Sequence, residues 1–172
     1  MDPAHAPRAD RRMAALIVLN CEEGGSVLIK GYHHVSITVS DLDRSIAFYR
    51  DLFGFILTGT AEAVGEELSA ALNVEQAALR LAVLEQGAMI LELIEYRAPE
   101  GRKAIAPRPC DVGCMHMALA VDNIHELYEE LSARGVRFNT PPQRNSEDVA
   151  WVWWCYLQDP DGVPIELVQK EA

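Results

Sequence analysis

The chain has 172 residues, of which 49% are hydrophobic, so it can bury the core of one large or two small domains and is not a disordered chain. Its 15 Lys and Arg against 26 Asp and Glu leave a formal charge of −11, which repels nucleic acid and anionic membrane surfaces. No apolar run resembles a bilayer span or a secretory signal. We therefore expect a cytoplasmic protein with neither a nucleic-acid nor a membrane partner.

The cysteines give little sign of a disulfide framework or of a metal site. There are four of them, and none stands in a CxxC pair. A protein of this length also needs no covalent staples. We expect free thiols at Cys21, Cys110, Cys114 and Cys155.

Residues 1–31 differ from the rest of the sequence. Prolines and a charged cluster precede one short apolar stretch and a Gly-Gly pair, which predicts an N-terminal extension with a mobile start. From residue 32 to 169 the pattern is regular, and we expect one domain there.

The first half of this domain opens with a strand and a helix. Residues 34–40 alternate polar and β-branched side chains, which is typical of a half-buried strand. Asp41 is a good helix N-cap, apolar residues then recur at helical spacing, and Gly54 ends the helix. Two further strands are expected over 78–84 and 88–96, joined by a turn at Gln86-Gly87.

The second half repeats this order at an offset of about eighty residues. A strand over 115–121 precedes a helix that begins near Asn123 and ends at Arg134-Gly135. A hairpin of 151–158 and 163–169 follows, with a four-residue turn over 159–162. The sequence predicts an α+β fold of two βαβ-plus-strand modules, with module one over 32–97, a Pro-rich linker over 98–112 and module two over 113–169.

Each module places one carboxylate, Glu92 or Glu166, among apolar strand neighbours. A buried carboxylate without a partner costs several kcal/mol, so each needs a cation or hydrogen-bond donors. His34 and His116 lie on the strand face whose neighbours are small or polar, so the four residues are expected to line one concave sheet surface. His33 and Glu95 are the rivals, and alternation assigns both to the opposite face.

A single strand histidine or glutamate is more often structural than functional. Four of them at equivalent positions of a duplicated unit favour a metal site instead. Two imidazoles and two carboxylates suit one divalent ion of Zn, Ni, Co, Mn or Fe, and the ligand types do not choose among these metals.

The aromatic run near the C-terminus is a candidate substrate wall. Pairing across the expected turn would place Trp151, Trp153 and Cys155 on the face of Glu166, and Trp154 and Tyr156 behind it. Thr38 of the first module is the fourth candidate for this wall. The alternative is that these rings only pack under a helix. The cations of the linker region are candidates for binding a substrate carboxylate or phosphate, or form a solvated loop: Arg97, Arg102, Lys103 and Arg108.

Four stretches resemble the vicinal oxygen chelate superfamily, which contains glyoxalase I, methylmalonyl-CoA epimerase, bleomycin-resistance proteins and extradiol dioxygenases. They are His34-Val-Ser-Ile-Thr-Val-Ser-Asp-Leu-Asp-Arg-Ser-Ile-Ala-Phe-Tyr49, Leu91-Glu-Leu-Ile-Glu-Tyr96, His116-Met-Ala-Leu-Ala-Val-Asp-Asn-Ile124 and Asp159-Pro-Asp-Gly-Val-Pro-Ile-Glu-Leu-Val168. The resemblance implies two βαβββ modules that form a curved mixed sheet around a central metal, often in a homodimer. It also implies metal ligands at His34, Glu92, His116 and Glu166.

The resemblance further narrows the activity. The resemblance implies three metal ligands in extradiol dioxygenases and fosfomycin-resistance enzymes, without an acid at the position of Glu92. The complete set of two histidines and two glutamates in this sequence is most similar to the site of glyoxalase I. Where glyoxalase I has an Arg for the glutathione carboxylate, this sequence has Thr38. The stretch that follows the second metal ligand in glyoxalase I is replaced here by Tyr96-Arg97-Ala98-Pro99. Both departures argue against glutathione as co-substrate.

Three functions follow as hypotheses for a small-molecule substrate. The first is a glyoxalase-like lyase or isomerase that removes a proton next to a metal-chelated carbonyl, with Glu166 or Glu92 as the catalytic base. The second is an Fe(II) extradiol-type dioxygenase. The third is a metal-free binding protein of the drug-resistance type.

Overall fold

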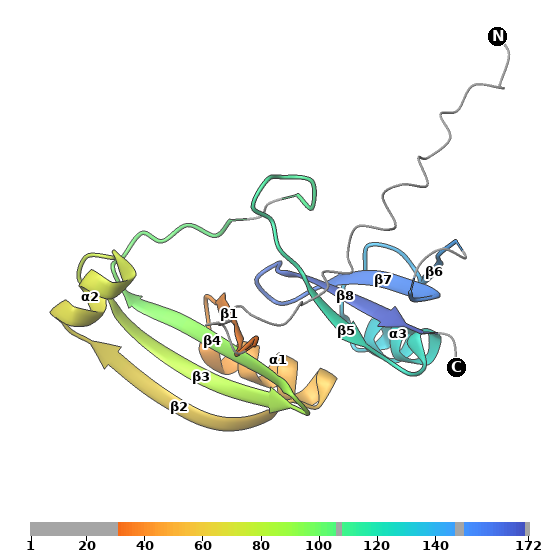
Figure 1. Ribbon diagram of the computed structural model, residues 1–172, viewed down its shortest axis with the longest axis horizontal. Helices are drawn as coiled ribbons and strands as arrows, with labels where there is room; N and C mark the ends of the chain where they lie inside the picture. The colour runs from red at the N-terminus through yellow and green to blue at the C-terminus, as the bar shows by residue number, and fades with distance from the viewer. Residues whose placement is uncertain (1–30, 106–107, 147–149, 171–172) are drawn as a thin grey trace, which may run out of the picture. The chain divides into compact units, whose positions relative to one another are not determined.

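The computed structural model describes residues 31–105, 108–146 and 150–170 of the protein (Figure 1). Residues His33–Ala172 form one compact unit. The predicted N-terminal extension and Cys21 lie outside the described residues, apart from Gly31 at the end of that extension.

The fold is α+β, as predicted, and is built from two four-stranded mixed sheets with the same strand order. Module one contains β1 (Val35–Thr38), α1 (Leu42–Phe53), β2 (Ile56–Val64), α2 (Glu66–Leu72), β3 (Ala78–Gln86) and β4 (Met89–Ala98). Module two contains β5 (Met117–Ala120), α3 (Ile124–Ala133), β6 (Gln143–Arg144), β7 (Trp153–Gln158) and β8 (Pro164–Gln169).

Corresponding strands of the two sheets pair in the same way. The order is β1-β4-β3-β2 in one sheet and β5-β8-β7-β6 in the other. In each sheet the first strand runs parallel to the last, and the other neighbours are antiparallel. The internal repeat is therefore a structural repeat of two βαβββ units.

The first helix of each module begins and ends where the sequence predicts. The Asp41 side chain accepts a hydrogen bond from the backbone N–H of Arg44 at 3.0 Å, and Asn123 accepts one from Glu126 at 3.3 Å. Gly54 ends α1 at φ 71°, in the left-handed region that favours glycine. Local capping therefore sets these boundaries.

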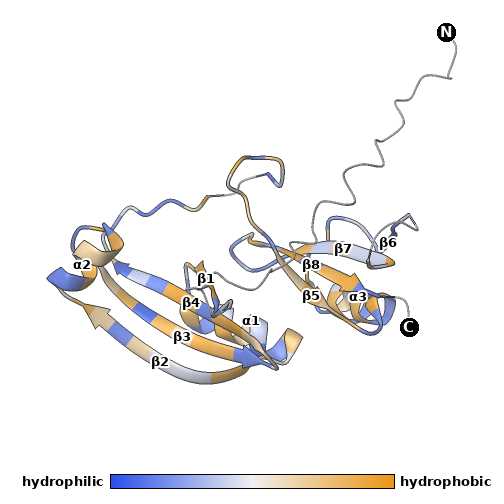
Figure 2. Ribbon diagram, in the orientation of Figure 1, coloured by the Kyte–Doolittle hydropathy of each residue, from blue (hydrophilic) through white to orange (hydrophobic). Residues whose placement is uncertain are grey.

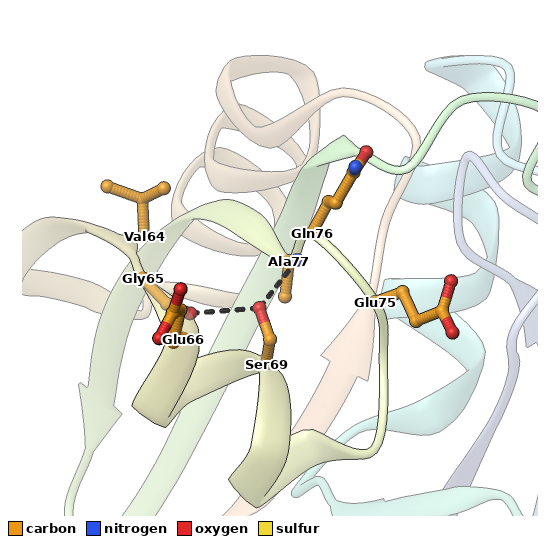
Figure 3. A pocket seen from close by; sticks show the side chains of 7 residues that line it. All are labelled: Val64, Gly65, Glu66, Ser69, Glu75, Gln76 and Ala77. Atoms are coloured by element: carbon orange, nitrogen blue, oxygen red, sulfur yellow. Dashed lines mark hydrogen bonds between the residues drawn. The ribbon is translucent and has the colours of Figure 1, made fainter.

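Module one has an insertion between β2 and β3, the short helix α2, which the sequence pattern does not predict. The Ser69 hydroxyl donates to the carbonyl of Gly65 at 2.9 Å and accepts from the N–H of Ala77 at 3.0 Å, so it closes this insertion on itself (Figure 3). An open pocket of about 580 Å³ lies here and is lined by Val64, Gly65, Glu66, Ser69, Glu75, Gln76 and Ala77.

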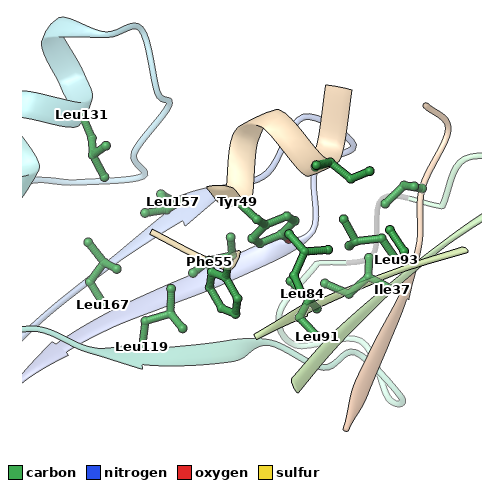
Figure 4. Close-up of a cluster of buried hydrophobic side chains, with 14 of the residues drawn as sticks. Ile37, Tyr49, Phe55, Leu84, Leu91, Leu93, Leu119, Leu131, Leu157 and Leu167 are labelled. Carbon is green, nitrogen blue, oxygen red and sulfur yellow. The ribbon is translucent and has the colours of Figure 1, made fainter. Parts of the chain in front are cut away.

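The core lies between each sheet and its helix. Figure 2 shows hydrophilic segments that interrupt the apolar runs of β3 and β4, as expected for strands with one face in the core. α1 packs on β3 and β4, and α3 packs on β8. One buried cluster contains side chains of both modules, among them Tyr49, Phe55, Leu84, Leu91, Leu119, Leu157 and Leu167 (Figure 4).

Two aspartates after β7 bind module one through hydrogen bonds. The Tyr49 hydroxyl donates to Asp159 Oδ2 at 3.2 Å, and both groups are fully or nearly fully buried. Asp161 accepts from the N–H of Ser40 at 2.9 Å and from Arg44 Nη2 at 2.6 Å. The loop that precedes β8 is thus connected to the start of α1.

The two hairpin loops differ from the predicted turns. Gln86 pairs with Met89, so the first loop is Gly87–Ala88, with Gly87 at φ 58°, instead of Gln86-Gly87. Gln158 pairs with Pro164, so the second loop is Asp159–Val163 and not the expected four-residue turn. Asp159 Oδ1 accepts from the N–H groups of Asp161 at 2.9 Å and Val163 at 2.8 Å, which stabilises the longer loop.

Candidate metal centre

Each sheet has a helix face, packed against its helix, and an open face on the other side. Because neighbouring strand residues alternate and paired residues share a face, the register assigns each paired strand residue to one of these two faces. The open face of module one includes Ser36, Thr38, Leu81, Val83, Glu92 and Ile94. The open face of module two includes Ala118, Ala120, Trp154, Tyr156, Glu166 and Val168.

The first candidate pair is His34 and Glu92. His34 stands immediately before β1, and Glu92 lies in β4 opposite Ser36. His34 Nε2 and Glu92 Oε2 are 3.6 Å apart, and the side chains are 41% and 23% exposed. The neighbouring His33 places its Nδ1 2.8 Å from Nδ1 of His34.

The second pair, His116 and Glu166, has the same relation to its sheet. His116 immediately precedes β5, and Glu166 lies in β8 opposite Ala118. His116 Nε2 is 3.1 Å from Glu166 Oε2, and the Glu166 side chain is only 10% exposed. A carboxylate this deeply buried needs a partner, and the imidazole is the partner that the structure provides.

Glu95, the rival of Glu92, lies on the helix face as predicted and has a structural role. Its Oε2 accepts from the N–H of Leu42 at 3.1 Å, at the first turn of α1. It also forms ion pairs with Arg80 and Arg97 at 3.7 and 3.2 Å. These contacts satisfy the carboxylate without a metal ion.

One protomer brings the four candidates together as two pairs and not as one group. Within residues 31–105, 108–146 and 150–170, no three His, Cys, Asp or Glu side chains gather closely enough to hold a metal ion. None of the four lines the pocket beside α2 either. The described residues therefore present two separate histidine–glutamate pairs, one on each open face.

The expected substrate wall is wrong by one residue. Tyr156, and not Cys155, pairs with Glu166, so Trp153 and Cys155 lie on the helix face. Trp153 packs edge-on against His125 of α3, with ring centroids 4.6 Å apart, and Cys155 is fully buried. Trp151 precedes β7 and belongs to neither strand face. The physical reason is the longer loop, because an odd shift in hairpin register turns every side chain to the other face.

The sequence pattern assigned Tyr156 and Trp154 to the wrong side of the strand, and the structure places both beside Glu166. The Tyr156 hydroxyl lies 3.3 Å from His116 Nε2, and the Tyr156 ring contacts those of His116 and Trp154 at centroid distances of 5.3 and 5.8 Å. Burial, and then the charge of Glu166, raise the pKa of Tyr156, so its hydroxyl stays protonated. Leu157 pairs with Ile165 and both are fully buried, which identifies their face as the helix face and leaves Tyr156 and Glu166 on the open one.

The cysteines of the described residues have no disulfide partners: Cys110, Cys114 and Cys155 are free. Burial raises the pKa of the Cys155 thiol to about 11, so it is not a reactive thiolate at neutral pH.

The linker cations contact groups within their own segment. Arg97 pairs with Glu95, Arg108 pairs with Asp111 at 2.7 Å, and Arg102 Nη1 donates to the carbonyl of Pro99 at 2.6 Å. Lys103 is exposed. These contacts favour the solvated-loop interpretation over a substrate anion site.

The donor atoms of both pairs fit a divalent ion. Two ligands at about 2.1 Å from one ion lie about 3 to 3.4 Å apart in octahedral or tetrahedral geometry. The observed Nε2–Oε2 separations of 3.1 and 3.6 Å are close to that range. Each pair could supply one imidazole nitrogen and one carboxylate oxygen, a mixture of ligand types that first-row transition metals accept.

The two βαβββ sheets have the arrangement expected of the vicinal oxygen chelate fold, and comparison with known proteins supports this fold. Residues 31–167 match the family model of the Glyoxalase/Bleomycin resistance protein/Dioxygenase superfamily. This protein belongs to that superfamily.

Individual relatives cover most of the sequence. The 2-epi-5-epi-valiolone epimerase of an Actinomyces species is 35% identical over 146 residues, covering 81% of this protein and 79% of the relative. The lactoylglutathione lyase of Salmonella typhimurium is 30% identical over 150 residues, covering 80% of this protein and 91% of the relative. A glyoxalase family protein of Bacillus cereus superposes with a TM-score of 0.72 at 20% identity, covering 84% of this protein and 96% of the other, which shows the shared fold.

None of the helices in the described residues has the length and hydropathy needed to cross a membrane.

Proposed function

We propose that this protein is a divalent-metal-dependent lyase or isomerase that abstracts a proton next to a chelated carbonyl group of a small molecule. The observation that supports it best is the duplicated His–Glu pair, which occurs at equivalent positions of both open faces with donor atoms 3.6 and 3.1 Å apart. The presence of both Glu92 and Glu166 also favours proton abstraction over the dioxygenase reaction, because a three-ligand dioxygenase site needs no acid at the position of Glu92.

The complete site needs two half-sites. Since the described part of one protomer brings only two ligands together at a time, we propose that module one of one protomer meets module two of its partner in a homodimer. Twofold symmetry then forms two equivalent quartets of His34, Glu92, His116 and Glu166.

When bound, the ion would act as a Lewis acid that stabilises negative charge on the substrate oxygen during proton removal. Glu166 is the proposed base, with Glu92 as the alternative. Glu166 lies on the open face with most of its side chain shielded from solvent, which suits transfer of a proton to and from a bound substrate. The relatives named as an epimerase and as a lyase are both consistent with such a step.

The first experiment measures metal content and proton exchange. Elemental analysis of the purified protein should give about one ion per protomer. In D₂O the metal-loaded protein should exchange the hydrogen next to the carbonyl of a substrate, and Glu166→Gln should slow that exchange by about a hundredfold or more. Retained exchange in Glu166→Gln would contradict the assignment of this base, and full activity of Glu92→Ala with oxygen uptake on catechols would indicate a dioxygenase.

The second experiment tests the shared site by mixing two inactive variants. One variant carries His34→Ala and Glu92→Ala, and the other carries His116→Ala and Glu166→Ala. In a mixed dimer with shared sites, one site has lost all four ligands and the other retains all four, so random mixing should restore about one quarter of the wild-type activity. If both pairs came from the same protomer, mixing would restore nothing.

A further inference from the structure

We infer that the substrate of this site is an uncharged carbonyl compound with several hydroxyl groups, and not a phosphate, a carboxylate or a glutathione adduct. This inference rests on the proposed function, because it names the substrate class for the same site. It follows from the charges and hydrogen-bonding groups that the two open faces present around the ligand pairs.

The strands of the described residues contain three lysine or arginine side chains, and all three lie on helix faces. Arg80 pairs with Glu95 across β3 and β4, and Arg97 lies two residues further along β4 on the same side. Arg144 pairs with Trp153, which packs on α3. The strand residues of both open faces therefore contain no lysine or arginine that could bind an anionic substrate.

The charged strand residues on the open faces are acids. Glu85 pairs with Ile90 and shares the open face with Glu92, and Glu166 lies on the other open face. The carboxylates of Glu92 and Glu166 balance the two positive charges of a divalent ion, so the quartet has no excess charge with which to attract an anion. With a formal net charge of −11, the protein as a whole adds further repulsion.

The uncharged polar groups on these faces are mostly hydroxyls close to the ligands. Ser36 pairs with Glu92, and Thr38 follows two residues along β1; both are exposed. On the second face the Tyr156 hydroxyl lies 3.3 Å from His116 Nε2. Hydroxyl groups both donate and accept, which suits the hydroxyl groups of a polyhydroxylated substrate.

Most of the remaining surface of the open faces is apolar, apart from the amide side chains of Gln143 and Gln158 on module two. Val83 and Ile94 flank Glu92 on one face, and Trp154 and Val168 lie beside Tyr156 and Glu166 on the other. The carbon-bound hydrogens of a cyclic or linear polyol pack on such side chains, while its hydroxyls reach the polar atoms between them.

The test compares neutral sugars with their own phosphate esters on the full-length, metal-loaded protein. Fructose and dihydroxyacetone are the neutral probes, and fructose 6-phosphate and dihydroxyacetone phosphate are the anionic ones. Binding is measured by titration calorimetry or ligand-observed NMR, and exchange of the hydrogen next to the carbonyl is measured separately in D₂O. We expect each neutral probe to bind at least about fivefold more tightly than its ester.

Tyr156→Phe and Thr38→Arg test the same inference from opposite directions. Tyr156→Phe should weaken binding of the neutral probes about fivefold through loss of one hydrogen bond. Thr38→Arg should strengthen binding of the phosphate esters about three- to fivefold. The matched control is Thr60→Arg, an exposed threonine of the same sheet that pairs with Ala82 on the helix face and should leave both probe classes unchanged.

Binding and exchange separate the two proposals. Preference for neutral probes without any hydrogen exchange would support the substrate class and contradict the proposed reaction. Tighter binding of the phosphate esters by the unmodified protein, or no binding of any neutral probe, would overturn the substrate class whatever the exchange result.

Discussion

The buried contact between Tyr49 and Asp159 offers a direct test of how module one is joined to the loop before β8. Tyr49 on α1 is 0% exposed and Asp159 is 1% exposed, and the Tyr49 hydroxyl donates to Asp159 Oδ2 at 3.2 Å. Oδ1 instead accepts from the N–H groups of Asp161 and Val163. Tyr49→Phe keeps the ring but leaves Oδ2 without its donor among the described residues.

A hydrogen bond to a charged group contributes about 1.5 to 3 kcal/mol, and we expect Tyr49→Phe to lower the free energy of unfolding by that amount at pH 7. For a unit of this size the loss corresponds to a decrease in Tm of about 5 to 12 °C. Urea unfolding is the measurement, and the midpoint should fall with no change in m value. Tyr128→Phe, whose ring packs on Phe138 at the surface of α3, is the control and should change stability by less than about 0.5 kcal/mol.

The effect should depend on pH in one direction. Burial raises the pKa of Asp159, while the hydrogen bonds from Val163, Asp161 and Tyr49 lower it, and the net result is above the ordinary value of 3.8. A carboxyl whose folded-state pKa is raised stabilises the fold at low pH and loses that contribution as the pH rises through its folded pKa. Because the Tyr49 hydrogen bond favours the charged form of Asp159, the penalty of Tyr49→Phe should shrink as the pH falls and Asp159 becomes neutral. An equal loss at pH 7 and near pH 4, or no loss at all, would refute this account.

Three further predictions concern the fold. Leu167→Ala, at a fully buried position of the core, should lower the free energy of unfolding, measured with urea, by about 2 to 5 kcal/mol. A decrease below about 1 kcal/mol would contradict the close packing of this side chain in the core. Burial raises the pKa of Asp161, but hydrogen bonds from Ser40 and Arg44 outweigh it and lower the net pKa. Ionised Asp161 should thus stabilise the fold above pH 3.8 and lose this contribution on acidification. The free energy of unfolding of Asp161→Asn should therefore fall less steeply with decreasing pH than that of the wild type. Gly54→Ala should lower the free energy of unfolding by about 1 to 2 kcal/mol, because φ at this position is 71° and strains any residue with a Cβ. The new Cβ itself would not clash, since the nearest side-chain atom is 3.6 Å away, and an unchanged Tm would exclude the backbone strain.

The two hairpins show where sequence-based prediction of strand faces succeeds and fails. In the first hairpin the predicted loop is displaced by one residue on both strands, an even change of register, so Glu92 keeps its predicted face. In the second hairpin the loop is one residue longer than predicted, so Trp153 and Cys155 exchange faces with Trp154 and Tyr156. Bonds from the Asp159 side chain to the loop backbone determine this length, and composition alone does not reveal them.

Local chemistry in the sequence determined much of this protein: the duplicated modules, the capped helices, and the histidine–glutamate pair on each sheet. These features depend on residues that are close together in the sequence or that repeat with a fixed period. Tertiary structure decided which aromatic residues stand beside Glu166, and that one protomer gathers its four candidate ligands as two pairs. Both outcomes depend on distances between strands that are remote in sequence, which a pattern of residue types does not specify.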